Sequence, residues 1–237
     1  MGKVILFKNN KGGVGKSLLT FWTGHILSSL ENLNGKKNKV LILTSDSQNN
    51  ILQLAGIDTG YGRGLEGYIE DGHGELMRLR EGLFYIPLTT TRIKSTFEDK
   101  FLKLIEIFKK QYDYVLIDGS PVLKLDDIFL DVSDKVVIPT FLDNVTTKGM
   151  INLIKEIGIE KIAMVVPNRV GRSKMEKKHL KMLRDNLDKG GIQVLDPIFQ
   201  SSKIMKLTEK GKTIMETKSI QYKTIQSTFV KIVKGVM

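Results

Sequence analysis

The sequence of 237 residues contains no cysteine. Without thiolates the chain cannot form a disulfide framework, a thiolate zinc site or a cysteine-ligated iron-sulfur cluster. It also has no run of 18 or more apolar residues, and a polar loop follows the short apolar stretch at residues 4–7, so we expect neither a membrane-spanning helix nor a signal peptide. With 237 residues, of which 41% are hydrophobic, the sequence predicts a cytoplasmic protein with a single α/β domain over residues 1–237.

Acidic residues are few compared with basic ones. The chain has 37 Lys and Arg but 26 Asp and Glu, which gives a formal net charge of +11. Residues 161–237 contain 17 of the basic and 6 of the acidic residues, which leaves 20 of each in residues 1–160. This basic C-terminal third suggests a surface that meets a polyanion, either nucleic acid or an acidic membrane. The simpler alternative is a lysine-rich solvated face.

Short apolar runs alternate with amphipathic segments along the chain. The predicted strands are "VILF" at residue 4, "VLILT" at 40, "LFYIP" at 83, "YVLID" at 114, "KVVIP" at 135, "IAMVV" at 162 and "IQVLDPI" at 192. Residues 98–110 have helical spacing, and the glycine-rich residues 60–74 are expected to be an irregular surface excursion. The predicted fold is α/β, a mostly parallel twisted sheet with helices on both faces.

The first predicted strand leads into "KNNKGGVGKS", which ends in Gly15, Lys16 and Ser17. These residues resemble the end of a nucleotide-binding P-loop, although the usual pattern has a glycine where this chain has Asn10. Backbone N–H groups of residues 12–17 can surround a phosphate as the next helix begins. Lys16 would then neutralise β- and γ-phosphate charge, and the Ser17 hydroxyl would hold Mg²⁺.

Two further predicted strands end near carboxylates. "YDYVLIDGSP" contains Asp118 at the end of its apolar run, and "VLILTSDSQNN" continues to Asp46. Ligands bind at the carboxyl ends of strands in open α/β sheets, so Asp118 is predicted to serve the metal and Asp46 to position the attacking water. A turn or a helix cap is the alternative role for a single aspartate in such a place.

With these segments in order, the chain resembles the ParA/MinD family of deviant Walker-A ATPases. "KGGVGKS" matches the family's K-G-G-x-G-K-[ST], "VLILTSDSQNN" its V-L-x-x-D-x-D-P-Q-x-N and "YDYVLIDGSPVL" its Y-D-x-I-I-I-D-x-P-P-S-L. "DKVVIPTFLDNVTTKGM", "MVVPNR" and "VLDPIFQSSKIMKLTEKGKTIME" are similar to later family segments. The similarity extends over nearly the whole chain.

The resemblance implies a role for a second loop lysine. Lys11 resembles the family's signature lysine, which crosses a dimer interface to the nucleotide of the other subunit, so ATP would join two subunits and hydrolysis would release them. The resemblance also implies that Asn168 forms a hydrogen bond with the adenine ring. The implied catalytic residues are Lys11, Lys16 and Asp46. The implied nucleotide-binding residues are Lys11, Gly12, Gly13, Val14, Gly15, Lys16, Ser17, Leu18, Asn168 and Pro197. The implied metal-binding residues are Ser17 and Asp118. The implied cofactors are ATP and Mg²⁺.

The chain departs from the family pattern at several positions. Thr44 replaces the first aspartate of D-x-D, Ser47 replaces a proline and Leu18 replaces a second hydroxyl residue after Ser17. Ser120 stands where a proline is usual. With these changes, a nucleotide-binding switch without turnover is an alternative to an ATPase.

Two members of the family fit best. The first is a short DNA-partition ATPase, because the P-loop lies too near residue 1 for a preceding helix-turn-helix. It would bind DNA without sequence preference, associate with the nucleoid and respond to a centromere-binding (ParB-type) adaptor. The candidate DNA contacts are Arg169, Arg172, Lys203, Lys206, Lys210, Lys212 and Lys218.

The alternative is a MinD-like membrane-cycling ATPase. The last residues, "STFVKIVKGVM", place Phe229, Val230, Ile232, Val233, Val236 and Met237 on one helical face, as in an interfacial anchor. A closing helix that packs on its own core has the same pattern and is the more common case. We therefore expect DNA rather than a membrane as the partner.

Overall fold

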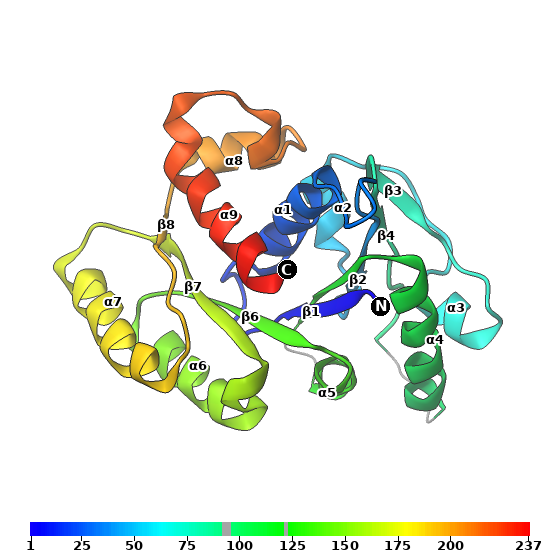
Figure 1. The fold of residues 1–237 in the computed structure, drawn as a ribbon, viewed down its shortest axis with the longest axis horizontal. Helices are drawn as coiled ribbons and strands as arrows, with labels where there is room; N and C mark the ends of the chain where they lie inside the picture. Colours follow the sequence, from blue (N-terminus) through cyan, green and yellow to red (C-terminus); the bar gives the residue numbers. More distant parts are fainter. Residues whose placement is uncertain (92–95, 121–122) are drawn as a thin grey trace.

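A central sheet between two layers of helices organises the chain, as seen in a computed structural model that describes residues 1–91, 96–120 and 123–237 (Figure 1). The described residues form eight strands in the order β3-β4-β2-β5-β1-β6-β7-β8. All neighbours pair in parallel except β3 and β4. In sheet order the strands are Met77–Arg80, Leu83–Tyr85, Val40–Thr44, Tyr114–Asp118, Lys3–Phe7, Lys135–Thr140, Ile162–Val170 and Ile198–Phe199. The predicted fold class is confirmed.

The central strands are buried on both faces. In β1, Val4 and Leu6 belong to one core cluster while Ile5 and Phe7 belong to the other, and all four are fully buried. Side chains alternate across a strand, so a strand covered on both faces needs apolar residues at every position. This is why the sheet could be recognised as continuous apolar runs.

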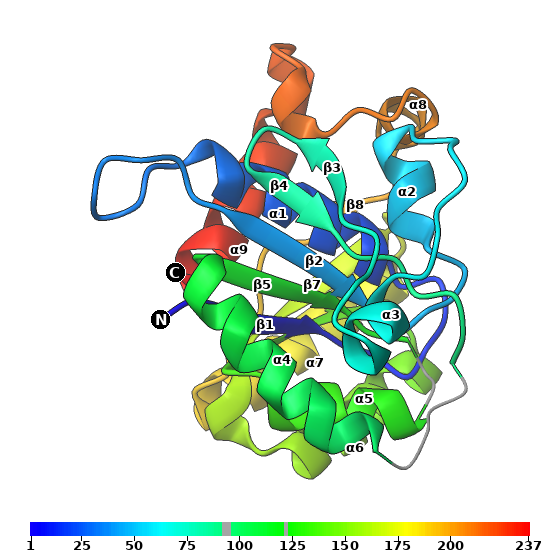
Figure 2. The same cartoon turned by 90° about the vertical axis from the view of Figure 1, so that its right-hand side faces the viewer.

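Each face of the sheet is covered by its own set of helices. One set contains α3 Leu65–Glu70, α4 Phe97–Gln111, α5 Leu123–Asp131, α6 Asn144–Ile157 and α7 Lys174–Leu187. The other contains α1 Lys16–Ser29, α2 Asn50–Ala55, α8 Ser202–Glu209 and α9 Lys223–Val236 (Figure 2). Single 3₁₀ turns lie at Ile159–Lys161, Asp188–Gly190, Ile214–Glu216 and Ile220–Tyr222. The carboxyl ends of the parallel strands are therefore the place where loops from both layers can meet.

Two sequence-based expectations need correction, and one strand was missed. The glycine-rich residues 60–74 contain helix α3, whose Leu65 and Ile69 are buried one turn apart. The strand expected from residue 192 is reduced to Ile198–Phe199 with one isolated bridge at Val194, because Pro197 has no N–H to donate to a ladder. Strand β3 was not predicted at all.

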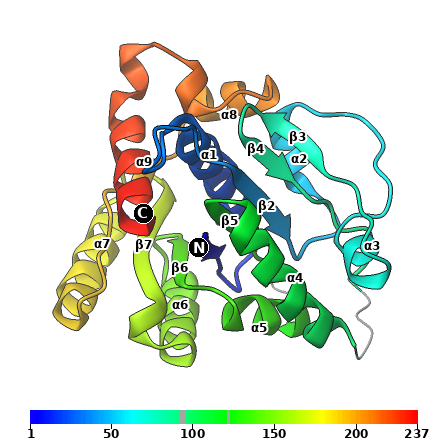
Figure 3. The same cartoon turned by 45° about the vertical axis from the view of Figure 1, so that its right-hand side comes forward.

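The last helix, α9, packs beside α1 (Figure 3). The rings of Phe229 and Trp22 lie 5.3 Å apart, and Ile232 and Val236 are also buried. Val230 and Met237, expected on the same apolar face, are instead 44% and 49% exposed. Most of the apolar face that could have entered a membrane is thus covered by the protein's own core. None of the described helices is long and apolar enough to span a bilayer.

Candidate functional site

The P-loop connects β1 to α1 and adopts a backbone that requires glycine. Gly13 and Gly15 have φ of 77° and 97°, in the left-handed region. A Cβ on Gly15 would lie 2.2 Å from the side-chain nitrogen of Asn168, so a larger residue would collide there. Asn168 donates from this nitrogen to the carbonyl of Val14 at 2.8 Å. The end of β7 therefore supports the P-loop from the side.

Lys16 is the first residue of α1 and is buried within the loop. Its ammonium donates to the carbonyls of Asn9 at 3.1 Å and Lys11 at 3.2 Å. Burial lowers the pKa of Lys16, and the neighbouring carboxylates, chiefly Asp118, oppose this. The loop thus holds a desolvated cation against its own carbonyls, a cation that anionic phosphates would stabilise further.

Asp118 ends β5 beside the P-loop and is 2% exposed. Burial raises its pKa to about 7, although the Ser17 hydroxyl and the Lys16 ammonium lower it. One carboxylate oxygen, Oδ1, is buried without a hydrogen-bond partner among the described residues. A carboxylate with a free oxygen next to a serine hydroxyl is a donor set that suits Mg²⁺, which takes one or two protein ligands and fills the rest with water and phosphate. No group of three or more His, Cys, Asp or Glu that could hold a metal occurs in the described part of the chain.

Asp46 lies in the loop after β2 and is partly exposed. Its carboxylate accepts from the Gln48 N–H at 3.0 Å and from the Asn50 side chain at 3.3 Å. The Thr44 hydroxyl accepts from the Asp46 N–H at 3.0 Å and donates to the carbonyl of Asp118 at 3.3 Å. Thr44, which replaces a family aspartate, therefore links the two carboxylate loops.

The P-loop and both carboxylate loops surround a cavity of about 490 Å³. Its lining residues are Gly12, Gly13, Gly15, Lys16, Ser17, Leu18, Asp46, Asn50, Gln53, Leu54, Gly119, Ser120 and Arg169. Six of these were predicted as nucleotide-binding, and two, Lys16 and Asp46, were predicted as catalytic. No pattern in the sequence pointed to Gln53 and Leu54, because they reach the cavity only through the placement of the short helix α2.

Four predicted nucleotide-binding residues lie outside this lining. Lys11 is exposed on the loop surface, Val14 is buried behind it, and Asn168 supports it. Pro197, partly buried just before β8, does not line the cavity either. The structure thus brings the predicted phosphate-binding residues together at one cavity, which neither Asn168 nor Pro197 lines.

The predicted DNA contacts are divided between two regions. Arg169 lines the cavity beside the P-loop and has φ of 52°, an unusual value for a residue with a side chain. The others, Arg172, Lys203, Lys206, Lys210, Lys212 and Lys218, lie at the surface, and four of them are on α8 or in the turn after it. Arg169 therefore belongs to the cavity lining and lies apart from the exposed lysines of α8 and the turn after it.

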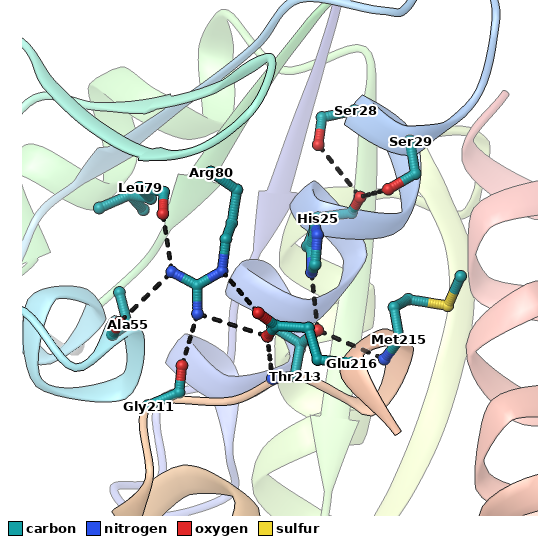
Figure 4. Close-up of polar contacts among 10 residues, drawn as sticks. All are labelled: His25, Ser28, Ser29, Ala55, Leu79, Arg80, Gly211, Thr213, Met215 and Glu216. Atoms are coloured by element: carbon teal, nitrogen blue, oxygen red, sulfur yellow. Dashed lines mark hydrogen bonds and ion pairs between the residues drawn. The ribbon is translucent and has the colours of Figure 1, made fainter. Parts of the chain in front are cut away.

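The turn after α8 is fixed to the rest of the protein by Arg80 (Figure 4). The Arg80 guanidinium donates to the carbonyls of Ala55, at the end of α2, and Gly211, after α8, and it pairs with Glu216 at 3.2 Å. The Thr213 hydroxyl and the His25 ring of α1 share a hydrogen bond of 2.7 Å. The basic end of α8 is therefore joined to α2, the helix that follows Asp46.

Comparisons with known proteins identify the family and the fold of the chain. Residues 5–214 match the family described as CobQ/CobB/MinD/ParA nucleotide binding domain. The chain is 29% identical over 171 residues to the sporulation initiation inhibitor protein Soj of Bacillus subtilis, a match that covers 66% of this chain and 65% of Soj. It is 24% identical over 234 residues to a putative septum site-determining protein MinD of Emiliania huxleyi, with 91% of this chain and 80% of the relative covered. Among solved structures, an ATP complex of a McdA variant from Cyanothece has the same fold, with a TM-score of 0.79 at 16% identity over 99% of this chain and 96% of McdA.

Proposed function

Because the chain belongs to the CobQ/CobB/MinD/ParA family of nucleotide-binding domains, we propose that it is an ATPase that dimerises with ATP and partitions DNA. The observation that carries the ATPase proposal is the buried ammonium of Lys16, held by loop carbonyls at a cavity that Asp46 also lines. A cation fixed in a glycine-rich loop at a helix N-terminus is arranged to receive phosphates. We propose residues 1–237 as one such domain.

The residues around the cavity have distinct proposed roles. Backbone N–H groups of residues 12–17 bind the phosphates, and Lys16 neutralises their charge. Asp46 orients the attacking water and accepts its proton, since its carboxylate lies at the cavity surface. Ser17 and Asp118 would hold Mg²⁺, which supplies charge neutralisation at the phosphate oxygens when bound.

Lys11 is proposed to act across a dimer interface. Its side chain is exposed and lies outside the cavity of its own subunit, although its carbonyl binds Lys16. An exposed cation on the rim of a phosphate site is available to a nucleotide in a facing subunit. We expect Lys11→Ala to bind ATP through Lys16 and the loop amides but to stay monomeric with ATP in sedimentation velocity. An ATP-dependent dimer of Lys11→Ala would contradict this role.

The ATPase proposal is tested by titration and hydrolysis. Lys16→Ala should lose ATP binding in calorimetry, because the phosphates lose their main positive partner within the subunit. Lys103→Ala, which changes an exposed lysine on the opposite face of the sheet, is the matched control and should bind like wild type. Tight ATP binding by Lys16→Ala would remove the P-loop assignment.

Hydrolysis separates an enzyme from a nucleotide-binding switch. Asp46→Ala should still bind ATP and remain a dimer, because only the activation of water is lost. Phosphate release at the wild-type rate would show that Asp46 is not the catalytic carboxylate. If wild-type protein binds ATP but releases no phosphate with DNA present, the switch without turnover is the better description.

DNA is the proposed polyanion, bound without sequence preference by the ATP dimer on the exposed lysines of α8 and its following turn. Lys203 and Lys206 are one helical turn apart, and the turn after α8 is joined through Arg80 to Ala55, at the end of α2. By analogy with partition systems, a centromere-binding (ParB-type) adaptor would stimulate hydrolysis and release the protein from the nucleoid. The MinD-like alternative would need the apolar face of α9, most of which is buried.

A charge-reversal pair tests the DNA surface. Lys203→Glu with Lys206→Glu should dimerise with ATP yet bind DNA weakly, and the log-log salt slope should flatten by about one unit for each phosphate that the protein no longer neutralises. Lys100→Glu with Lys103→Glu is the control, because it makes the same charge change at the same spacing on α4, on the other face of the sheet. Equal loss of DNA affinity in both variants would mean that net charge alone matters. Co-sedimentation of wild type with anionic liposomes but not with DNA would favour the membrane alternative.

A further inference from the structure

A buried ion pair connects the residue after β1, where the P-loop begins, to helix α5. Lys8, the residue after β1, donates from its ammonium to Oδ2 of Asp126 in α5 at 2.7 Å. The two side chains are 5% and 1% exposed. Removing two charges from water costs several kcal/mol per ion, and well-packed apolar residues often stabilise a fold as well or better. Stability alone is therefore a poor explanation for this pair.

The second oxygen of Asp126 holds the two carboxylate loops together. Oδ1 accepts from the Ser45 hydroxyl at 2.8 Å and from the Ser120 N–H at 3.2 Å. The Ser45 hydroxyl oxygen in turn accepts from the Ser120 N–H at 2.6 Å. Ser45 directly precedes Asp46, and Ser120 follows Asp118 by two residues. One carboxylate thus connects both loops that border the phosphate cavity.

This connection depends on a departure from the family pattern. Ser120 stands where the resemblance gives a proline, and proline has no N–H to donate. Lys8 occupies Oδ2 of Asp126, which leaves Oδ1 turned toward the two loops. The serine at position 120 therefore belongs to a set of hydrogen bonds rather than being an isolated change.

We infer that Asp126 is a positioning residue for ATP hydrolysis, which joins the loops of Asp46 and Asp118 through Ser45 and Ser120 while Lys8 keeps its charge paired. The inference rests on the proposed ATPase function. Because Asp126 does not line the cavity, its loss should change the chemical step more than nucleotide binding. Small displacements of groups that orient a water lower the rate strongly, by up to about 100-fold for 1 Å.

Two double variants separate positioning from folding. Lys8→Met with Asp126→Leu removes the ion pair and the acceptor oxygen, whereas Lys8→Met with Asp126→Asn removes the same ion pair but keeps a side-chain oxygen for Ser45 and Ser120. Neither leaves an unpaired buried charge. We expect both to bind ATP within about threefold of wild type. The Leu variant should lose about 10- to 100-fold in kcat, and the Asn variant should stay within about threefold.

Hydrogen exchange gives a readout that does not need hydrolysis. Backbone amides in residues 44–49 and 118–120 should exchange faster in the Leu variant than in the Asn variant and wild type. Equal kcat and equal amide exchange in the two double variants would overturn the inference, whether both variants keep the wild-type kcat or both lose it to the same extent. If wild type hydrolyses no ATP, the proposed function fails, and the exchange comparison alone decides whether Asp126 joins the loops. Should the Leu variant not fold, Ser45→Ala removes the same hydroxyl bridge with the ion pair intact and should show the same faster exchange.

Discussion

Asp118→Asn should change how the stability of the protein depends on pH. The buried Asp118 carboxyl has a pKa of about 7 in the folded chain, against an ordinary value of 3.8. Between these two values the unfolded chain releases this proton while the folded chain keeps it. The free energy of unfolding contributed by Asp118 therefore falls as the pH rises from about 4 to 7, and it does not fall further above that range.

The size of the effect follows from the difference in pKa. Each unit is worth about 1.4 kcal/mol, so the full interval from 3.8 to about 7 corresponds to roughly 4 kcal/mol. Between pH 5 and pH 8 wild type should lose roughly 2–3 kcal/mol relative to Asp118→Asn, because asparagine does not titrate. The loss reflects the cost of an ionised carboxylate that is buried beside Ser17 and Lys16.

Urea unfolding at pH 5 and pH 8, without divalent cations, measures this difference. Asp127→Asn, which changes an exposed carboxylate one residue beyond Asp126, is the control and should follow wild type at both pH values. Adding Mg²⁺ at pH 8 should stabilise wild type but not Asp118→Asn, since a cation that binds only the folded carboxylate shifts the equilibrium. Parallel pH dependences for wild type and Asp118→Asn would refute the reasoning.

Two further changes test the packing that supports the site. Phe229→Ala should lower the free energy of unfolding by about 3–5 kcal/mol because it empties a fully buried position against Trp22, while Val230→Ala on the exposed side should change it by less than about 0.5 kcal/mol. Arg80→Leu should cost about 1.5–3 kcal/mol, because the carbonyl of Gly211 and its neighbours lose a charged donor. Chemical denaturation measures all three, and equal losses at residues 229 and 230 would show that α9 is not packed in solution as it is here.

The P-loop residues that line the cavity could be grouped from the sequence because their signals are local. A glycine-rich loop that follows an apolar strand and has Lys16 and Ser17 at the start of a helix can be recognised within one short segment of sequence. Asp46 and Asp118 follow buried strands, and parallel strands deliver their carboxyl ends to one edge. The sheet itself was predictable for a similar reason, since strands buried on both faces need uninterrupted apolar sequence.

The parts that escaped prediction depend on contacts between distant segments. Strand β3, "MRLR", has no apolar run and exists because it pairs with β4. Helix α3 is six residues long in a glycine-rich segment and is held by Leu65 and Ile69 against the core. Short elements of this kind receive their stability from packing rather than from local preference.

The residues that depart from the family pattern also make contacts with distant segments, which the local sequence does not reveal. In the sequence, Thr44 is only the loss of an acidic residue of the family pattern, yet its hydroxyl joins the Asp46 N–H to the carbonyl of Asp118. Lys8 and Asp126 are 118 residues apart, and neither belongs to a recognisable motif, but together they hold the other side of the same two loops. A residue that differs from the family pattern can therefore still help to connect these two loops, through hydrogen bonds that the pattern does not predict. If Thr44 and Asp126 both connect the two loops, Thr44→Val should increase the amide exchange rates of residues 44–49 more in the Lys8→Met, Asp126→Leu variant than in wild type. In wild type the Asp126 connection remains when the Thr44 hydroxyl is removed, whereas in the double variant neither connection is left.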